Sequence, residues 1–380
     1  MSSPALMEDL VEEILLRFPP HEPACLVRAA LVCKRWCRFI SGPGFRRRFR
    51  ELHRTPPLLG FLYRSLIDSD GANLTRFVPT AAFCSPQVEI RSWRPLDARH
   101  GRVLFRSPLE ISDLEELMVW DPITDEKRKL PIPPRNAFSW TAAVLCSGAG
   151  SCDHLDCHRG PFLVVFVGSD SVETFIYTYS SDAAAWSKPI CIQDAEGRFY
   201  SLMRSPLVGN ALYFGFSGTN KALKYDMELR EMFWIQLPST CSNLGLRVLT
   251  TTEDGRLGLV TADGNKIYMW SRKAGSNDAG WTQNRVIELE RLLPSDSILT
   301  SPDVLCFAEG IHVIFVRSNN VLFTIDLKAC KVKKVCKGKG IRAVVPYMNF
   351  YTPGMGVQLC LVFCFKMFTS NILAANMKFG

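Results

Sequence analysis

The chain has 380 residues, which is more than one ordinary domain and enough for a substantial hydrophobic core. Its residues are 47% hydrophobic and 22% charged, a composition that excludes an intrinsically disordered protein. The formal net charge is +8, and residues 1–54 carry half of it; the nearly neutral remainder argues against an extended nucleic-acid-binding surface.

The sequence predicts a protein of the cytoplasm or the nucleus. Four acidic residues between positions 8 and 13 interrupt the apolar segment that a secretory signal would need. No apolar run approaches the ~20 residues that span a bilayer, so we expect no membrane contact. The fourteen cysteines are therefore expected to be reduced thiols, most of them serving as small buried apolar groups.

Residues 6–40 predict two short amphipathic helical stretches. Leu6, Leu10 and Ile14 recur every four residues in the first stretch, which a proline pair ends. The second begins near Pro23 and has an apolar sector too wide for a simple surface helix. Part of that sector is expected to face another molecule, although a helical hairpin packed on the following domain would also give this pattern.

This segment resembles the F-box, the short helical module that docks the substrate receptor of a ubiquitin ligase onto a Skp-family adaptor. The family pattern runs Leu-Pro-x-Asp-Leu, then Ile-Leu-x-x-Leu-Pro, then Val-Cys-Lys-x-Trp. The chain departs from it at Met7, where the family has proline, and at Phe18, where it has leucine. The matching residues are Leu6, Asp9, Leu10, Ile14, Leu15, Pro19, Val32, Cys33, Lys34 and Trp36.

The resemblance implies which side chains bind the adaptor. Apolar residues of both stretches would enter a groove of the adaptor, in the way that amphipathic helices bind grooves in general. The expected adaptor-binding set is Leu6, Leu10, Ile14, Leu15, Pro19, Leu31, Val32 and Trp36.

The run FRRRFRELHR at 45–54 contains five arginines. Clustered arginines attract phosphate, so nucleic-acid binding is one interpretation. Because Phe45, Phe49 and Leu52 share one helical face, we prefer a solvated basic helix that packs these three side chains inward. We therefore expect no nucleic-acid partner.

From residue 55 onward the sequence predicts strands, because short apolar runs are separated by Gly, Pro, Asn and Asp. A weak repeat is visible, in which a strand ends in Asp or Ser and a short turn leads to a second strand. The equivalent positions are Asp121, Ser180, Asp226, Ser271 and Asp326, spaced about 45–60 residues apart.

A repeat near 50 residues that consists only of strands is typical of β-propeller blades. Residues 55–380 would form six or seven blades, with Asp121, Asp226 and Asp326 at equivalent turns between the two outer strands. Two interpretations of the apolar segment 357–368 stay open, namely the closing strand of the ring and a departure from the usual C-terminal end of such proteins. An array of irregular β-sandwiches is the alternative.

The strand region also resembles known families. Its units are similar to the kelch-like propellers behind F-boxes, although they lack the double glycine. They are closer to the F-box-associated regions of plant proteins, especially those of grasses. The marks of this resemblance are PPLLGF at 56–61, CDHLDCHRGPFLVVFVG at 152–168 and LKYDMELREMFWIQLP at 223–238.

Cys152, His154, Cys157 and His158 lie within seven residues and are of the types that bind zinc. Their spacing is not that of a zinc finger or ribbon, and Cys146 is the only close addition. We therefore expect a polar loop between strands and no metal site.

Together these observations predict a mainly β protein with a helical F-box-like domain at 1–54 and a β-propeller-like domain at 55–380. The resemblance implies a substrate-recognition subunit of an SCF-type ubiquitin ligase, with the adaptor, a cullin and an unknown target protein as partners. We expect no catalytic residues and no cofactor, since GxSxG, HExxH, P-loop and GxGxxG motifs are absent. A propeller interaction module that acts outside any ligase is the alternative, and an enzyme with a propeller active site is third.

Overall fold

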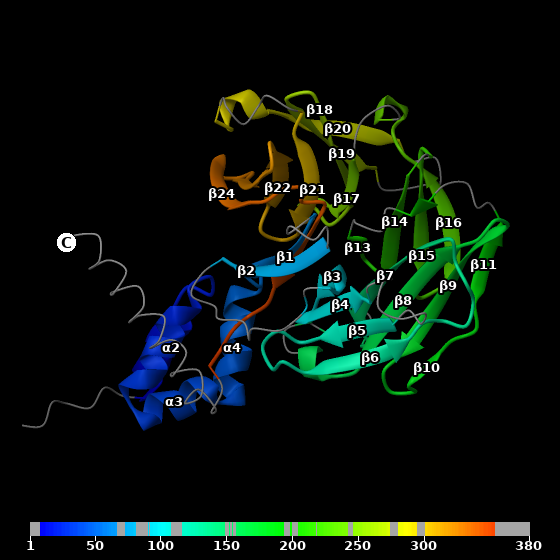
Figure 1. Cartoon of the computed structure of the whole chain (residues 1–380). Coiled ribbons are helices and arrows are strands. Elements are labelled where there is room, and N and C mark those ends of the chain that lie inside the picture. The colour runs from blue at the N-terminus through cyan, green and yellow to red at the C-terminus, as the bar shows by residue number, and fades with distance from the viewer. Residues whose placement is uncertain are drawn as a thin grey trace, which may run out of the picture. The chain divides into compact units, whose positions relative to one another are not determined.

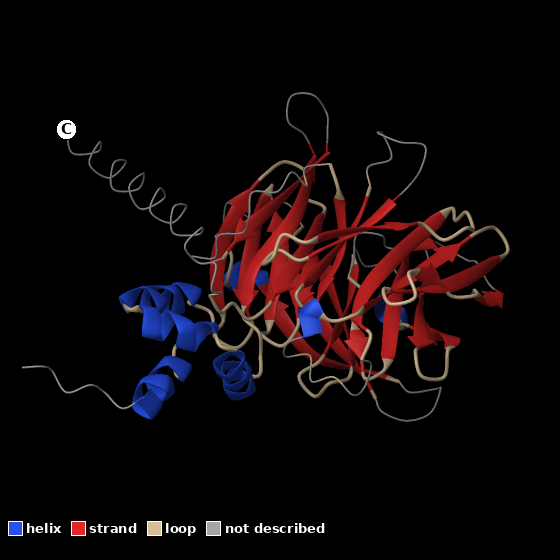
Figure 2. Cartoon of the chain, turned by 90° about the horizontal axis from the view of Figure 1, so that it is seen from below, coloured by secondary structure: helices blue, strands red, loops and turns tan. Residues whose placement is uncertain are grey.

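The computed structural model describes residues 8–66, 73–80, 90, 92–107, 116–148, 152, 154, 157–193, 198–199, 204–217, 219–241, 246–273, 280–294 and 301–353. The chain divides into two compact units (Figures 1 and 2). The helical unit comprises Met1–Leu59, Pro79–Pro86 and Asn349–Gly380, and the β unit comprises Gly60–Val78 and Gln87–Met348.

The described part of the helical unit contains four helices: α1 (Glu8–Leu16), α2 (Pro23–Val32), α3 (Lys34–Ser41) and α4 (Pro43–His53). The second predicted stretch is two helices and not one, because Cys33 is extended, with φ −160° and ψ 161°. The Sγ atom of Cys33 accepts a hydrogen bond from the Trp36 amide at 3.4 Å, which caps α3. Proline in the first turn of α2 and of α4 lacks only an amide that would have no partner within the helix.

The helical unit has its own apolar core. Aromatic rings contribute much of it: Phe45 stacks on Phe49 at 5.9 Å, and Phe350 packs edge-on against Phe49 at 6.2 Å. The prediction that Leu52 packs inward is wrong, since its side chain is 58% exposed. The apolar side chains that are almost completely buried here include Leu15, Leu26, Ile40, Phe45 and Phe49.

The basic residues of α4 have acidic neighbours. Arg47 pairs with Glu51 at 2.7 Å, and Arg48 pairs with the buried carboxylate of Glu12 on α1. These pairs offset part of the positive charge that the arginine run carries, and the Arg48 pair joins the first helix to the last.

The β unit is a six-bladed β-propeller (Figure 1). The first blade contains β3 (Arg94–Arg99), β4 (Arg102–Arg106), β5 (Glu116–Trp120) and β6 (Lys127–Pro131). The second blade contains β7 (Ser139–Cys146), β8 (Phe162–Ser169), β9 (Glu173–Ser180), β10 (Ala185–Trp186) and β11 (Ile190–Gln193). The third blade contains β12 (Arg198–Phe199), β13 (Leu207–Val208), β14 (Ala211–Ser217), β15 (Lys221–Asp226) and β16 (Glu231–Gln236). The fourth blade contains β17 (Arg247–Thr251), β18 (Leu257–Asp263), β19 (Lys266–Arg272) and β20 (Trp281–Glu288). The fifth blade contains β21 (Asp303–Ala308), β22 (Val313–Ser318), β23 (Val321–Asp326) and β24 (Lys331–Lys337). Short 3-10 helices cover Cys157–Arg159, Ser239–Cys241 and Leu289–Arg291. The predictions of a mainly β chain and of a propeller are confirmed, and the number of blades is six.

The sixth blade closes the ring. It contains β1 (Leu58–Leu66), β2 (Asn73–Pro79) and β25 (Ala343–Met348), in the order β2-β1-β25, so strands from both ends of the propeller share one sheet. The Tyr347 hydroxyl donates to the Gly101 carbonyl of the first blade at 3.3 Å. The ring of Phe61 packs against Phe315 of the fifth blade at 5.2 Å. The closing strand is thus β25, and the segment 357–368 lies outside the described residues.

The aspartates of the sequence repeat lie at equivalent turns, as predicted. Each follows or ends the third strand of a blade, and its Oδ1 atom accepts hydrogen bonds from the amides two and three residues further on. The donors are Ile123 and Thr124 to Asp121, Glu228 and Leu229 to Asp226, and Lys328 and Ala329 to Asp326, at 2.8–3.3 Å. The residue four positions after each aspartate has a left-handed backbone: Asp125, Arg230 and Cys330. The repeat is therefore the sequence mark of one turn, used blade after blade.

Replacing Asp326 with alanine is expected to lower the free energy of unfolding of the propeller by about 1 kcal/mol, because two turn amides lose their acceptor. Asp326→Asn keeps an acceptor oxygen at the same place and should retain most of the stability. Urea unfolding of both variants measures the difference. Equal destabilisation by the two substitutions would show that the turn bonds are not responsible.

Candidate adaptor-binding face and the centre of the propeller

Large apolar side chains are exposed on both of the first two helices. Leu10 and Ile14 of α1 are 49% and 52% exposed, and Leu31 and Val32 of α2 are 47% and 65% exposed. Ten large apolar side chains are exposed in the described part of the chain, and these four lie within one short stretch. Single exposed apolar residues are ordinary, whereas a group of them marks a binding surface.

Helical geometry separates this surface from the core. Leu10 and Ile14 are one helical turn apart, so they lie on the same side of α1. Leu15 follows Ile14 by about 100° of rotation, and its side chain is only 1% exposed. The first helix therefore uses one apolar side for the core of the helical unit and leaves another in solvent. We call Leu10, Ile14, Leu31 and Val32 the apolar face.

Residues 6–48 match the F-box domain. The matched range covers α1, α2, α3 and the first half of α4, and it includes all the residues expected to bind the adaptor.

We also compared the whole chain with curated proteins and with solved structures. The comparison with curated proteins finds no match to the chain. Among solved structures, TolB from Acinetobacter baumannii is 13% identical with a TM-score of 0.42, over 78% of this chain and 69% of its own. A chain of the nidogen/laminin complex is 13% identical with a TM-score of 0.44, over 77% and 99%, and the Dos1 propeller is 10% identical with a TM-score of 0.38, over 74% and 69%.

The structure distinguishes the members of the expected adaptor-binding set. The apolar face supplies four of them. Pro19 and Trp36 are half-buried, and Leu6 lies outside the described residues. Because Leu15 belongs to the core of the F-box domain, its side chain packs the fold and is not available to a partner.

A buried ionic network occupies the centre of the propeller, and no motif in the sequence indicates it. Asp97 on β3 is fully buried, and its Oδ2 atom accepts from the Val144 amide of β7 at 3.0 Å. Its Oδ1 atom accepts from Arg204 Nε at 3.0 Å. Arg99 Nε lies 3.4 Å from Asp97 Oδ2, and burial lowers the pKa of Arg99, although Asp97 opposes that shift.

The same network continues to the fourth and fifth blades. Arg204 Nη1 pairs with Glu309 Oε2 at 3.3 Å, and Glu309 Oε1 accepts from the Thr251 hydroxyl at 3.2 Å. Burial lowers the pKa of Arg204, but the negative charges of Glu309 and Asp97 raise it by more. The pKa therefore lies above its ordinary value, and the guanidinium stays charged. The side chains thus link residues of five blades across the centre of the ring.

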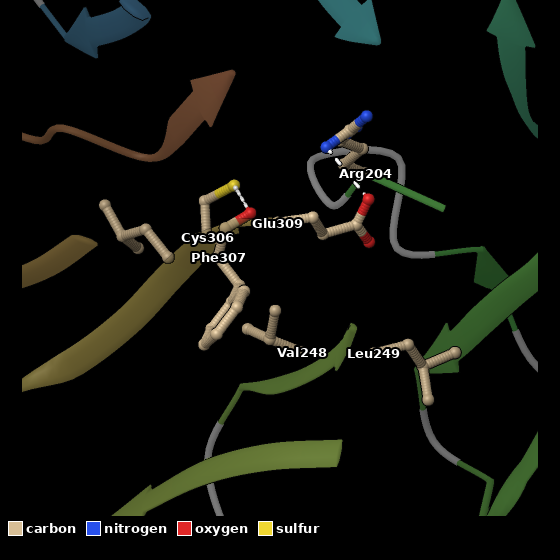
Figure 3. Close-up of a pocket in the computed structure, with 7 residues that line it drawn as sticks. Arg204, Val248, Leu249, Cys306, Phe307 and Glu309 are labelled. Carbon is tan, nitrogen blue, oxygen red and sulfur yellow. Dashed lines mark hydrogen bonds and ion pairs between the residues drawn. The ribbon is translucent and has the colours of Figure 1, made fainter. Parts of the chain in front are cut away.

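A small pocket beside this network is shown in Figure 3. The Arg204–Glu309 pair forms one side of it, and Val248, Leu249 and Phe307 supply apolar surface. Cys306 donates to the Phe307 carbonyl, with 3.5 Å between Sγ and O, and burial raises the pKa of its thiol to about 12. The polar groups of the pocket are already paired with each other, which indicates a structural role.

Cys306 is expected to resist alkylation in the folded protein, because the reactive species is the thiolate and burial opposes its formation. Cys330, which is exposed at the turn after β23, should react readily under the same conditions. Brief treatment with iodoacetamide followed by peptide mass spectrometry measures both sites. Equal modification of the two thiols would contradict the burial of Cys306.

Among the described helices, none combines the length and the apolar character needed to cross a membrane.

Proposed function

We propose that this protein is the substrate-recognition subunit of an SCF-type ubiquitin ligase. In this proposal the F-box domain binds a Skp-family adaptor, which joins it to the cullin, and the propeller binds the target protein. The observation that carries the proposal is the apolar face, four large apolar side chains that an F-box domain leaves in solvent. Burial of apolar surface contributes roughly 25 cal/mol per Å², so a groove that covers these side chains would bind them favourably.

The proposed contact residues follow from exposure. Leu10, Ile14, Leu31 and Val32 would enter the adaptor groove, with the half-buried Pro19 and Trp36 at its border. Leu6 is retained from the family pattern. Leu15 would act indirectly, because it holds α1 on the core and so fixes the direction in which Ile14 points.

The propeller is proposed as the target-binding domain, with the boundary between residues 54 and 55. Its loops can vary while the blades hold them in place, which suits a recognition surface. The protein itself would carry out no bond chemistry; it would raise the local concentration of the target near the ubiquitin-carrying enzyme. We further propose that the protein acts in the cytoplasm or the nucleus. We also propose that its propeller is kelch-like and of the type found in F-box proteins of grasses.

Adaptor binding by the full chain tests the proposal. The full chain should capture a Skp-family adaptor together with the cullin, and the chain that lacks residues 1–54 should not. Circular dichroism of the shortened chain, with a β spectrum retained, serves as its folding control. Adaptor capture by the shortened chain would contradict the assignment, and absence of capture by the intact, folded chain would favour a propeller module that acts outside a ligase.

A further inference from the structure

Four metal-binding side chains meet at the connection between β7 and β8. Cys146 is the last residue of β7, Cys157 begins a 3-10 helix before β8, and Cys152 and His154 lie between them. Their ligand atoms, three Sγ atoms and one imidazole nitrogen, all lie within 4.8 Å of one another. Cys157 Sγ and His154 Nδ1 are 3.7 Å apart.

These separations suit a tetrahedral ion. Sulfur ligands bind zinc at ~2.3 Å, so two of them at the corners of a tetrahedron lie about 3.8 Å apart. The cluster therefore needs only small side-chain movements to surround one ion. We propose that Cys146, Cys152, His154 and Cys157 form a structural zinc site of the Cys3His type. Four protein ligands leave no open position, so the ion would hold the loop and would not act on a substrate.

Groups around the cluster support the sulfur ligands. The Gly148 amide donates to Cys146 Sγ, and the His154 amide donates to Cys152 Sγ, both at 3.4 Å. In each case the donor lies two residues after the cysteine, and an N–H group that points at a ligating sulfur holds that ligand in position. The imidazole of His154 is stacked on that of His100 at 4.0 Å with an angle of 8° between the rings, which orients the ligand.

The neighbouring blade holds this loop in place. Arg102 of β4 donates through Nη2 to the Cys157 carbonyl at 2.8 Å and also to the Gly160 carbonyl. The Cys146 amide donates to His100 Nδ1 at 3.1 Å, so that nitrogen carries no proton. A zinc ion would thus fasten the β7–β8 connection at a place where the first and second blades already contact each other.

Packing alone does not account for these residues. Cys146 is buried, but Cys152 and Cys157 are half-buried and His154 is exposed, so the group is not part of an apolar core. The spacing of Cys152, His154, Cys157 and His158 by itself predicts a loop without metal. The fourth ligand is instead Cys146, which the strand brings to the loop, and His158 is not part of the cluster.

Metal analysis of the full chain, purified with reductant and without a metal-binding tag, tests the site. We expect one equivalent of zinc per chain. The double variant Cys152→Ser, Cys157→Ser should lose it, and the control Cys191→Ser, Cys330→Ser, which changes two exposed thiols outside the cluster, should keep it. Cobalt added to the metal-free chain should give the visible absorption of tetrahedral thiolate coordination.

Two further measurements keep the test decisive. A chelator should lower the melting temperature of the native chain and make Cys152 and Cys157 reactive to iodoacetamide. His154→Asn changes an exposed residue, so this variant is expected to fold and to bind zinc less tightly even if the cysteine variants aggregate. A folded native chain with little zinc and no cobalt absorption, or with a disulfide among these cysteines, would overturn the proposal.

Discussion

The double substitution Leu10→Ser, Ile14→Ser is expected to weaken adaptor binding about 10- to 150-fold without lowering the melting temperature of the propeller. About half of each side chain is exposed in the free protein and would become buried in the adaptor groove. Complete burial of such a side chain contributes roughly 1.5–3 kcal/mol, so the exposed half contributes about 0.8–1.5 kcal/mol. Since 1.4 kcal/mol is tenfold in affinity, the two residues together give about 10- to 150-fold. Calorimetric titration with the adaptor and thermal unfolding are measured on the same variant.

Two single substitutions serve as controls. Leu52→Ser replaces an equally exposed leucine of α4 outside the residues that match the F-box domain, and it should leave the affinity unchanged. Leu15→Ala removes a buried side chain and should destabilise the helical unit by about 2–5 kcal/mol, as cavities in cores do. An equal loss of affinity in the Leu52 variant, or none in the double variant, would refute the apolar face as the binding surface.

Replacing Asp97 with alanine is expected to destabilise the propeller by about 3–5 kcal/mol. The substitution leaves the guanidinium of Arg99 buried without its acidic partner and takes one of the two acidic partners from Arg204. It also removes the acceptor of the Val144 amide. In a domain of this size, 1 kcal/mol shifts the melting temperature by about 2–4 °C, so a decrease of about 6–20 °C is predicted.

Glu116→Ala is the matched control, because it breaks an ion pair of the same blade. Glu116 and Lys129 lie 2.8 Å apart, but both side chains are exposed, and such pairs are worth about 0–1 kcal/mol. Scanning calorimetry of the two variants compares a buried network with a surface pair. If both variants melted at nearly the same temperature, the central network would not contribute to stability in the way proposed.

The features that the sequence predicted are the local ones. An aspartate that accepts bonds from the next two or three amides depends on its own turn only, so Asp121, Asp226 and Asp326 could be recognised without a structure. The strand β8 is buried on both faces, which is why the run Phe162–Val167 is apolar throughout and predicts a strand although it shows no alternation. The F-box pattern likewise depends on spacings within about forty residues.

The features that the sequence analysis missed depend on distant residues. Asp97 and Arg204 are separated by 107 positions, and no short motif relates them. The choice of β25 as the closing strand depends on its pairing with β1 at the other end of the propeller. Periodicity also could not decide which apolar residues of α1 face solvent, because neighbours such as Ile14 and Leu15 belong to one wide sector and differ only in what packs against them.

The closure of the sixth blade has a consequence for how the protein is made. Because β1 pairs with β25, the ring cannot be completed during synthesis until the ribosome has produced all the other blades. The four N-terminal helices precede every strand and can emerge much earlier. Pairing between such distant strands is slow, so an unfinished propeller exposes strand edges for a long time. We therefore expect the propeller, and not the helices, to need chaperones during translation. Substitutions that weaken the pairing of β25 should increase that need.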